Sequence, residues 1–355
     1  MLDDLLGAAV PGVASAAVAM VAVDGVTVAA VAAGELVRYT DAAETLAPER
    51  PAAGLDTVFD LASVTKLFTT VVVLSLAEDR RLGLDDPVAT WLPAHYADRP
   101  AVTVRHLLTH TAGLPPGRRV GTAPPGRARW DLILSTPSST PAGIAYTYSD
   151  VGMITLGRVA EIAGGAPLDV LVRDRVTGPL GLADTMYRPG PGLLPRIAAT
   201  EYKAGRGGCV RGEVHDETAY ALGGVAGHAG LFGTAADLLR FGEMLRTGGA
   251  GVLPARAVAE MMRDQGVIGA EFRQGLGVRI GDPALSGPLP DARGHTGFTG
   301  TSLLVDPGRG LTVVLLTNNV HPYRGRAGIR DLRNAVAAAA GDRLPGGLPP
   351  PRAVS

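Results

Sequence analysis

The chain has 355 residues, of which 46% are hydrophobic, and its formal net charge is −1. This is enough apolar material for a large core without disulfides, and the single cysteine, Cys209, lies in a polar, glycine-rich stretch that indicates no redox role. No basic run interleaved with aromatic residues is present, which excludes a nucleic-acid-binding protein. We expect a small molecule or a peptide as the partner.

Residues 8–34 are almost wholly apolar, but their pattern differs from that of a signal peptide or a membrane span. Asp3 and Asp4 stand where a signal peptide carries basic residues. The turn dipeptides Pro11-Gly12 and Asp24-Gly25 divide the run into pieces too short to cross a bilayer. We therefore expect a β-hairpin here, in a cytoplasmic protein that does not bind a membrane.

Hydrophobic periodicity and turn residues predict the elements in chain order. The expected helices are residues 2–9, 63–77, 85–92, 104–110, 151–162, 168–176, 235–245, 254–262 and 329–340. The expected strands are residues 14–23, 26–33, 57–62, 274–280, 301–305 and 311–317. Residues 39–55 and 113–129 are expected as loops, the second bordering a binding cleft or mobile. The Pro-rich tail 346–355 is expected to be disordered.

This order predicts an α+β fold in one catalytic domain, residues 1–345. Two strands near the N-terminus and three near the C-terminus are expected to form a single antiparallel sheet, flanked by the helices of both chain ends. Residues 1–80 and 235–345 would make this α/β lobe, and residues 81–234 would form a helical lobe inserted into it.

The sharpest local signal is Ser63-Val-Thr-Lys66, at the start of a predicted helix with apolar residues on all sides. Ser63 and Lys66 lie one turn apart on one helix face, so the lysine can take the serine proton. Burial lowers the pKa of an ammonium group, which predicts a neutral amine that activates Ser63 as a nucleophile. The alternative is that Ser63 only caps the helix and that Lys66 is a surface residue.

The use of lysine in this chain favours the catalytic interpretation. Among 33 lysines and arginines, only Lys66 and Lys203 are lysines. Arginine does not deprotonate in proteins, so a site that needs a neutral amine requires a lysine.

Two further segments carry polar groups suited to such a site. Tyr146-Thr-Tyr148-Ser-Asp150 precedes a predicted helix, where the Tyr148 phenol could share the proton transfer or simply pack with a hydrogen-bonded hydroxyl. Gly294-His295-Thr296-Gly297-Phe298-Thr-Gly300 is a glycine-rich edge ahead of a strand. Its small residues allow backbone N–H groups to approach a ligand, although the segment also fits an ordinary turn.

In this order the three segments resemble the serine β-lactamase and penicillin-binding-protein superfamily, whose signatures are Ser-x-x-Lys, Tyr-x-Asn or Ser-x-Asn, and Lys/His-Thr-Gly. Nearly the whole chain is similar to class C β-lactamase-like esterases and peptidases. Four segments carry this similarity: 59–66 (FDLASVTK), 107–114 (LLTHTAGL), 223–232 (GGVAGHAGLF) and 315–319 (LLTNN). The resemblance implies a β-lactamase/transpeptidase-like fold and an acyl-enzyme mechanism.

The resemblance also implies a role for each matching residue. Ser63 would attack a carbonyl, while Lys66 and Tyr148 manage its proton. The N–H groups of Ser63 and Phe298 would form the oxyanion hole that stabilises the tetrahedral intermediate. No metal and no other cofactor is implied.

Asp150, His295, Thr296 and Gly297 would bind the substrate, and two of them depart from the family pattern. Asp150 stands where Asn is usual, and His295 stands where many β-lactamases have Lys. A histidine is mostly neutral near pH 7, and an added aspartate repels anions. We therefore expect a neutral or amine-bearing ester, amide or peptide substrate, and no efficient hydrolysis of β-lactams.

Three functions remain open at this point: a hydrolase that acts through acyl-Ser63, a transacylase that passes the acyl group to an amine or alcohol, and a non-catalytic receptor that keeps it. The sequence does not identify the acyl donor, the stereochemical preference or the oligomeric state. His110, His215 and His228 do not have metal-ligand spacing and are expected as loop or core histidines. Among them, His228 is the one expected to line the cleft.

Overall fold

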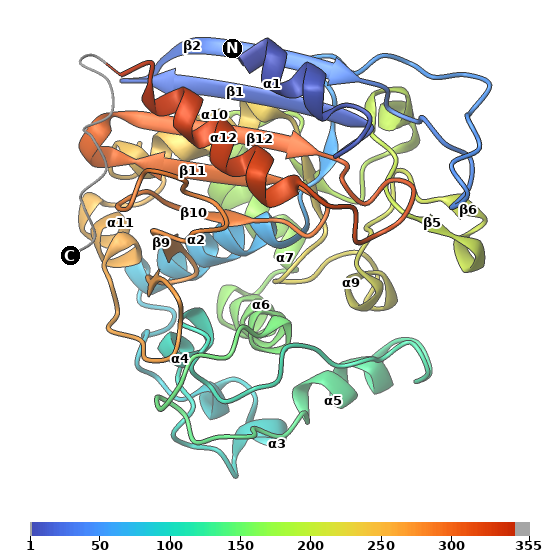
Figure 1. The fold of residues 1–355 in the computed structure, drawn as a ribbon. Coiled ribbons are helices and arrows are strands. Elements are labelled where there is room, and N and C mark those ends of the chain that lie inside the picture. Colours follow the sequence, from blue (N-terminus) through green and yellow to red (C-terminus); the bar gives the residue numbers. More distant parts are fainter. Residues whose placement is uncertain (1, 345–355) are drawn as a thin grey trace.

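The computed structural model describes residues 2–344, and its centre is an antiparallel sheet of seven strands (Figure 1). In spatial order these are β2 (Val26–Gly34), β1 (Ala16–Val23), β12 (Leu311–Thr317), β11 (Ser302–Asp306), β10 (Arg293–Thr296), β9 (Arg279–Ile280) and β8 (Arg273–Gln274). Two strands come from the N-terminal part and five from the C-terminal part, and β1 pairs with β12 from Ala17↔Thr317 to Val23↔Leu311. The expected sheet built from both chain ends is confirmed.

Helices cover both faces of this sheet, and the segment 81–234, expected as a helical lobe, contains helices α3 to α9. The helices are α1 (Leu2–Ala9), α2 (Thr65–Glu78), α3 (Pro93–Tyr96), α4 (Val104–Leu108), α5 (Arg127–Leu134), α6 (Asp150–Gly164), α7 (Leu168–Val172), α8 (Gly178–Leu180), α9 (Glu217–Ala221), α10 (Ala235–Arg246), α11 (Ala255–Met262) and α12 (Ile329–Gly341). Two small sheets consist of β3 (Phe59–Asp60), β7 (Leu231–Gly233) and β4 (Met186–Tyr187), and of β5 (Tyr202–Lys203) and β6 (Gly208–Cys209).

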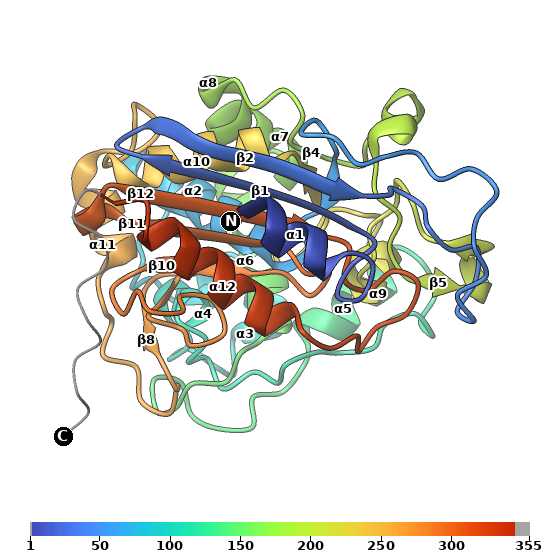
Figure 2. The ribbon, with the colours of Figure 1, turned by 45° about the horizontal axis from the view of Figure 1, so that its top comes forward.

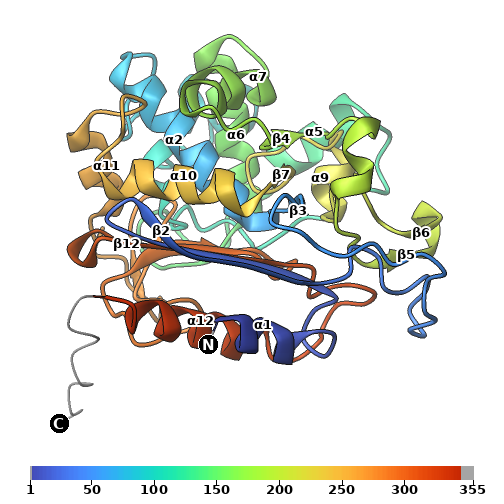
Figure 3. The ribbon, with the colours of Figure 1, turned by 90° about the horizontal axis from the view of Figure 1, so that it is seen from above.

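Alternate residues of β1 enter two separate cores, because successive side chains of a strand point to opposite faces. Ala17 and Val21 pack in the core under α1 and α12, which lie side by side over one face of the sheet (Figures 2 and 3). Ala16 and Val18 belong to the other core, which α2 and α10 share with the helical lobe. Covered on both faces, β1 has the uninterrupted apolar sequence of a buried strand.

Helix α2 is apolar all round and runs between the sheet and α6, which accounts for the buried helix predicted here. All its residues from Thr65 to Leu74 are buried. The Phe68 ring stacks on Phe241 of α10, with centroids 3.9 Å apart and planes at 13°. A helix packed on every side gives a rigid base to the residues at its N-terminus.

Two predictions near the C-terminus were wrong. The expected strand 274–280 is the hairpin of β8 and β9, because Gly277 turns the chain with φ +62° and a Cβ there would lie 2.0 Å from the Thr70 hydroxyl. Residues 294–300 were expected as a glycine-rich edge ahead of a strand, but the first three of them belong to strand β10. Its sequence has no apolar alternation, and the strand forms because it pairs with β11 and β9.

Three further boundaries differ. The helix expected at 85–92 is only a 3₁₀ turn, Val88–Thr90, and α5 begins at Arg127, inside the loop expected at 113–129. The strand expected at 57–62 is reduced to Phe59–Asp60. None of the helices between residues 2 and 344 combines the length and hydropathy needed to cross a bilayer. The tail 346–355, for which the sequence predicts disorder, lies outside the described residues.

Candidate active site

A strained turn presents Ser63. Ser63 lies in the 3₁₀ turn Ala62–Val64, directly before α2, and not in the first turn of the helix as expected. Ala62 has φ +46°, which is unfavourable for a residue with a Cβ. The Ala62 N–H donates to Asp60 Oδ1 at 2.8 Å, and the Val64 N–H donates to the Leu61 carbonyl at 3.1 Å. These bonds stabilise a conformation that the local sequence alone disfavours.

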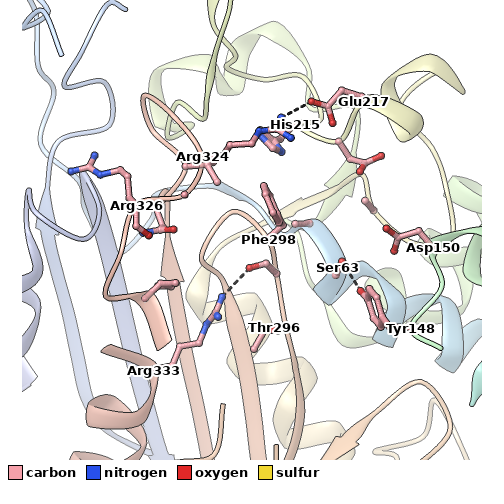
Figure 4. Close-up of a pocket in the computed structure, with 18 of the residues that line it drawn as sticks. Ser63, Tyr148, Asp150, His215, Glu217, Thr296, Phe298, Arg324, Arg326 and Arg333 are labelled. Atoms are coloured by element: carbon pink, nitrogen blue, oxygen red, sulfur yellow. Dashed lines mark hydrogen bonds and ion pairs between the residues drawn. The ribbon is translucent and has the colours of Figure 1, made fainter. Parts of the chain in front are cut away.

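The polar atoms of Ser63, Lys66 and Tyr148 meet at one point, and Figure 4 shows the bond between Ser63 and Tyr148. Lys66 Nζ donates to Ser63 Oγ at 2.8 Å, and the Tyr148 hydroxyl donates to the same oxygen at 3.0 Å. Lys66 Nζ also donates to the carbonyl of His228 at 3.1 Å. The serine oxygen is therefore held between two groups that can carry its proton.

The charge state of Lys66 differs from the expectation. Burial is the largest single influence on the pKa of Lys66 and lowers it, but Asp150, whose Oδ1 lies 2.8 Å from Nζ, and Tyr148 together outweigh burial and hold that pKa above its ordinary value. Burial is likewise the largest influence on the pKa of Asp150 and raises it, but the charge and hydrogen bond of Lys66 and the nearby His228 together lower that pKa. The resting pair is an ammonium and a carboxylate. The prediction of a neutral amine in the resting site was wrong, because it considered burial without the counter-ion.

Tyr148 is positioned by the start of α6. Ser149 is the N-cap of this helix, with its hydroxyl accepting from the Gly152 N–H at 3.0 Å, and the Ser149 N–H donates to His110 Nδ1 at 3.2 Å. Lys66 Nζ and the Arg279 guanidinium lie 4.9 Å and 5.0 Å from the centroid of the Tyr148 ring. The phenol is thus fixed by a helix cap on one side and by two cations on the other.

The end of β10 lies directly against the turn that carries Ser63. A Cβ at Gly297 would lie 2.6 Å from the carbonyl oxygen of Leu61, so only glycine allows this approach. The next residue, Phe298, is 58% exposed, and its ring stacks on His215 with centroids 5.6 Å apart. Thr296, Gly297 and Phe298 line the same cavity as Ser63.

His295 lies apart from the cavity wall. Its side chain is only 1% exposed, and Nδ1 donates to the carbonyl of Thr296 at 2.7 Å. Burial, together with the charges of Arg279 and Lys66, lowers its pKa well below the ordinary value, so the ring is neutral. The imidazole packs near the Tyr148 ring, with ring centroids 6.0 Å apart. It is not among the residues that line the cavity.

The cavity has a volume of about 600 Å³. Ser63, Tyr148 and Asp150 lie at one end of it, and the segment 319–333 forms the other end. Of the residues predicted to form the site, the structure brings together Ser63, Lys66, Tyr148, Asp150, Thr296, Gly297 and Phe298.

Comparison with known proteins agrees with this geometry. A family model described as Beta-lactamase matches residues 8–338. This chain belongs to the β-lactamase family. An Escherichia coli (strain K12) protein named "Putative D-alanyl-D-alanine carboxypeptidase" is 35% identical over 306 residues, which span 75% of this chain and 70% of that protein.

Two solved structures are similar to this β-lactamase-family protein over almost its whole length. EstCE1, "a hydrolase with promiscuous acyltransferase activity", superimposes with a TM-score of 0.73 and 25% identity, over 94% of this chain and 97% of that one. Unliganded simvastatin synthase (LovD) from Aspergillus terreus gives a TM-score of 0.74 at 19% identity, over 96% and 98% of the two chains. The second likeness concerns the fold alone.

The motifs did not point to the arginines of this β-lactamase-family site. Four of them line the cavity: Arg279, Arg324, Arg326 and Arg333 (three of them labelled in Figure 4). Arg279 pairs with Asp282 at 2.9 Å, and Arg324 pairs with Glu201 and Glu217 at 2.5 Å each. They come from β9, from α12 and from the loop before it, far in sequence from Ser63. The only signal was the clustering of four arginines between residues 324 and 333.

Arg326 and Arg333 have no carboxylate partner within residues 2–344. Arg333 donates to the carbonyls of Gly297 at 2.9 Å and Thr301 at 3.1 Å, while Arg326 donates to the carbonyls of His321, Pro11 and Gly12. Burial and the nearby charge of Arg279 lower the pKa of Arg333 to about 10, so it remains a cation at neutral pH. Asp150, in contrast, is already neutralised by Lys66. The cavity therefore offers unpaired positive charge.

The remaining histidines have structural contacts. His110 is buried, and burial together with the charges of Lys66 and Arg279 lowers its pKa to about 3. The ring of His228 is also buried and pairs with Asp216 at 2.9 Å, so its carbonyl, and not its ring, reaches Lys66. No group of three or more His, Cys, Asp or Glu residues in the described chain is arranged to hold a metal ion.

Proposed function

We propose that this protein is a serine hydrolase that forms an acyl-enzyme on Ser63. The observation that supports this most is that Ser63 Oγ accepts hydrogen bonds from both Lys66 and Tyr148 at the edge of a 600 Å³ cavity. A hydroxyl held by two groups that can exchange its proton has the arrangement needed for an activated nucleophile.

In the proposed acylation step, which takes place in molecules whose Lys66 amine has lost its proton, Ser63 Oγ bonds to the acyl carbon while the Ser63 proton passes to Lys66 Nζ. The N–H groups of Ser63 and Phe298 stabilise the charge that develops on the carbonyl oxygen. The bond to the leaving group then breaks, and the leaving group takes the proton. Water attacks the acyl-serine in the same way, releases the acid and restores Ser63.

We further propose that the substrate carries a carboxylate. This differs from the neutral or amine-bearing substrate expected from Asp150 and His295, because Asp150 is paired with Lys66 and two arginines of the cavity lack a carboxylate partner. Charge-assisted hydrogen bonds from a guanidinium are among the stronger contacts available to a carboxylate. The name of the Escherichia coli relative, a carboxypeptidase of D-alanyl-D-alanine, agrees with a peptide that ends in a free carboxylate.

The Arg333→Gln variant should separate recognition of the carboxylate from chemistry. For an acylated D-alanyl-D-alanine peptide we expect KM to rise about tenfold, whereas KM for its methyl ester should change less than about twofold. Arg330→Gln is the matched control, since Arg330 is exposed on the same helix. Equal increases in KM for both substrates would contradict the assignment.

A transacylase is the second candidate function. It is favoured by EstCE1, which covers almost the same length and is described as having promiscuous acyltransferase activity. Whether water or another acceptor attacks acyl-Ser63 depends on which one binds better in the cavity.

Product analysis tests both functions. The protein would be mixed with p-nitrophenyl acetate, with and without an amine such as D-alanine, and the products and the Ser63 peptide analysed by mass spectrometry. A hydrolase gives acetate in both mixtures, whereas a transacylase gives the N-acetyl amine. An acetyl group on another residue, with none on Ser63 at any time, would contradict the acyl-enzyme proposal.

A further inference from the structure

Asp60 lies three residues before Ser63, where several walls of the cavity meet. Its side chain is only 2% exposed, and both carboxyl oxygens accept backbone hydrogen bonds: Oδ1 from the Ala62 N–H at 2.8 Å and Oδ2 from the His215 N–H at 2.6 Å. No lysine or arginine among the described residues pairs with it. The hydrogen bonds of its carboxyl group therefore stabilise the conformation of the backbone.

The first of these bonds acts on the nucleophile. Ala62, with φ +46°, is the residue that turns the chain so that Ser63 faces the cavity. Such a conformation persists only where surrounding contacts hold it. The bond from the Ala62 N–H to Asp60 is the side-chain contact that does so.

The second bond ties the opposite wall to the same carboxyl group. His215 stacks on Phe298, and the next residue, Asp216, pairs with His228 Nε2 at 2.9 Å. The carbonyl of His228 accepts from Lys66 Nζ. A displacement of His215 would therefore shift Phe298 directly and would shift Lys66 through Asp216 and His228.

The backbone of the same residue anchors the loop that carries Phe298. The Thr299 hydroxyl donates to the carbonyl of Asp60 at 2.8 Å, and the Thr301 hydroxyl donates to the carbonyl of Leu61 at 3.0 Å. The turn with Ser63, the wall with His215 and the loop with Phe298 are thus all bonded to two consecutive residues.

We propose that Asp60 is a positioning residue that sets the placement of the Ser63 and Phe298 N–H groups relative to each other and to the Ser63 hydroxyl. The inference rests on the proposed acyl-enzyme function and adds a residue that touches neither the substrate nor the reacting atoms. Hydrogen-bond donors that stabilise an oxyanion act only over a narrow range of distance, so a small shift lowers the rate without weakening binding of the substrate.

The test compares Asp60→Asn, Asp60→Ala and Thr299→Val with wild type. Asparagine keeps one accepting oxygen and can serve only one of the two N–H groups, so kcat should fall about tenfold in Asp60→Asn and about 100-fold in Asp60→Ala. KM for the same ester should stay within about threefold. Binding of a phenylboronic acid, which forms a tetrahedral adduct with the serine, should weaken in proportion to the loss of kcat/KM.

Asp237→Asn is the matched control. Asp237 is also a buried aspartate, and its Oδ2 accepts from the Asp184 N–H at 2.8 Å and the Thr185 hydroxyl at 2.9 Å, away from the cavity. It should lower the thermal midpoint and leave kcat within about twofold of wild type. If Asp60→Ala does not fold, Asp60→Asn and Thr299→Val are compared with wild type and with Asp237→Asn in its place.

The inference is overturned if Asp60→Asn and Thr299→Val keep wild-type kcat and boronate affinity, or lose no more activity than Asp237→Asn. Ser63→Ala, assayed in parallel, separates this failure from that of the proposed function. If Ser63→Ala is inactive and the Asp60 variants are not impaired, only the role of Asp60 is wrong. If Ser63→Ala keeps its activity, both proposals are wrong.

Discussion

Replacing Ser63 by alanine is expected to lower kcat/KM for an activated ester by about 10⁴-fold or more, the loss that follows removal of a covalent nucleophile. The side chain of Ser63 makes two hydrogen bonds at the cavity and no core contact of its own, so the thermal midpoint should change by only a few degrees, about 1 to 4 °C. Ester hydrolysis followed at 400 nm and thermal unfolding measure the two effects. The fold should survive while the activity disappears.

Ser75→Ala is the control for this variant. Ser75 is on the same helix α2, and its hydroxyl accepts from Arg175 at 2.7 Å, away from the cavity. This variant should keep full activity. A fluorophosphonate probe should label wild type and Ser75→Ala, but not Ser63→Ala. Labelling of another residue in all three proteins would contradict the proposed nucleophile.

Replacing Lys66 by methionine is expected to lower kcat by about 10³-fold, because one of the two groups that exchange the Ser63 proton is lost. It also leaves Asp150 without its counter-ion. Breaking a buried pair costs about 3 to 5 kcal/mol, and because Asp150 is 31% exposed we expect a smaller loss in the free energy of unfolding, about 2 kcal/mol. Denaturant unfolding and steady-state kinetics measure the two losses.

The double variant Lys66→Met/Asp150→Asn separates the roles of Lys66 in stability and in catalysis. With both charges removed, most of the unfolding free energy should return, while kcat stays low. Recovery of activity in the double variant would contradict a catalytic role for Lys66.

Asp150→Asn alone should move the pH dependence of the reaction. The charge of Asp150 holds the pKa of Lys66 above its ordinary value, so in wild type the amine loses its proton only at high pH. Without that charge, burial is the larger influence and lowers the pKa. The ascending limb of kcat/KM should therefore shift to lower pH, by about one unit or more. An unchanged limb, or a shift to higher pH, would contradict proton acceptance by Lys66.

The local sequence was sufficient for features that depend on neighbours in the chain. Apolar residues on all sides of the segment 63–77 predicted a buried helix, and the turn at Asp24-Gly25 predicted the hairpin of β1 and β2. Ser63 and Lys66 could be paired because a helix repeats every 3.6 residues. In the structure their polar atoms are 2.8 Å apart.

The charge of the site could not be predicted from the local sequence, because it depends on ionisable side chains that come into contact only in the folded chain. Lys66 was expected to be neutral since burial was the only influence visible in its own helix, whereas Asp150, 84 positions later, holds it as a cation. Arg279 and Arg333 reach the cavity from β9 and α12, and no local pattern marks them as part of a site. Asp60 likewise has partners far away in the chain: its carboxyl group accepts from His215, 155 positions later, and its carbonyl accepts from Thr299, 239 positions later. Periodicity along the chain therefore predicted most of the elements and the pairing of Ser63 with Lys66, while long-range contacts set the electrostatics of the cavity and the placement of the residues that line it.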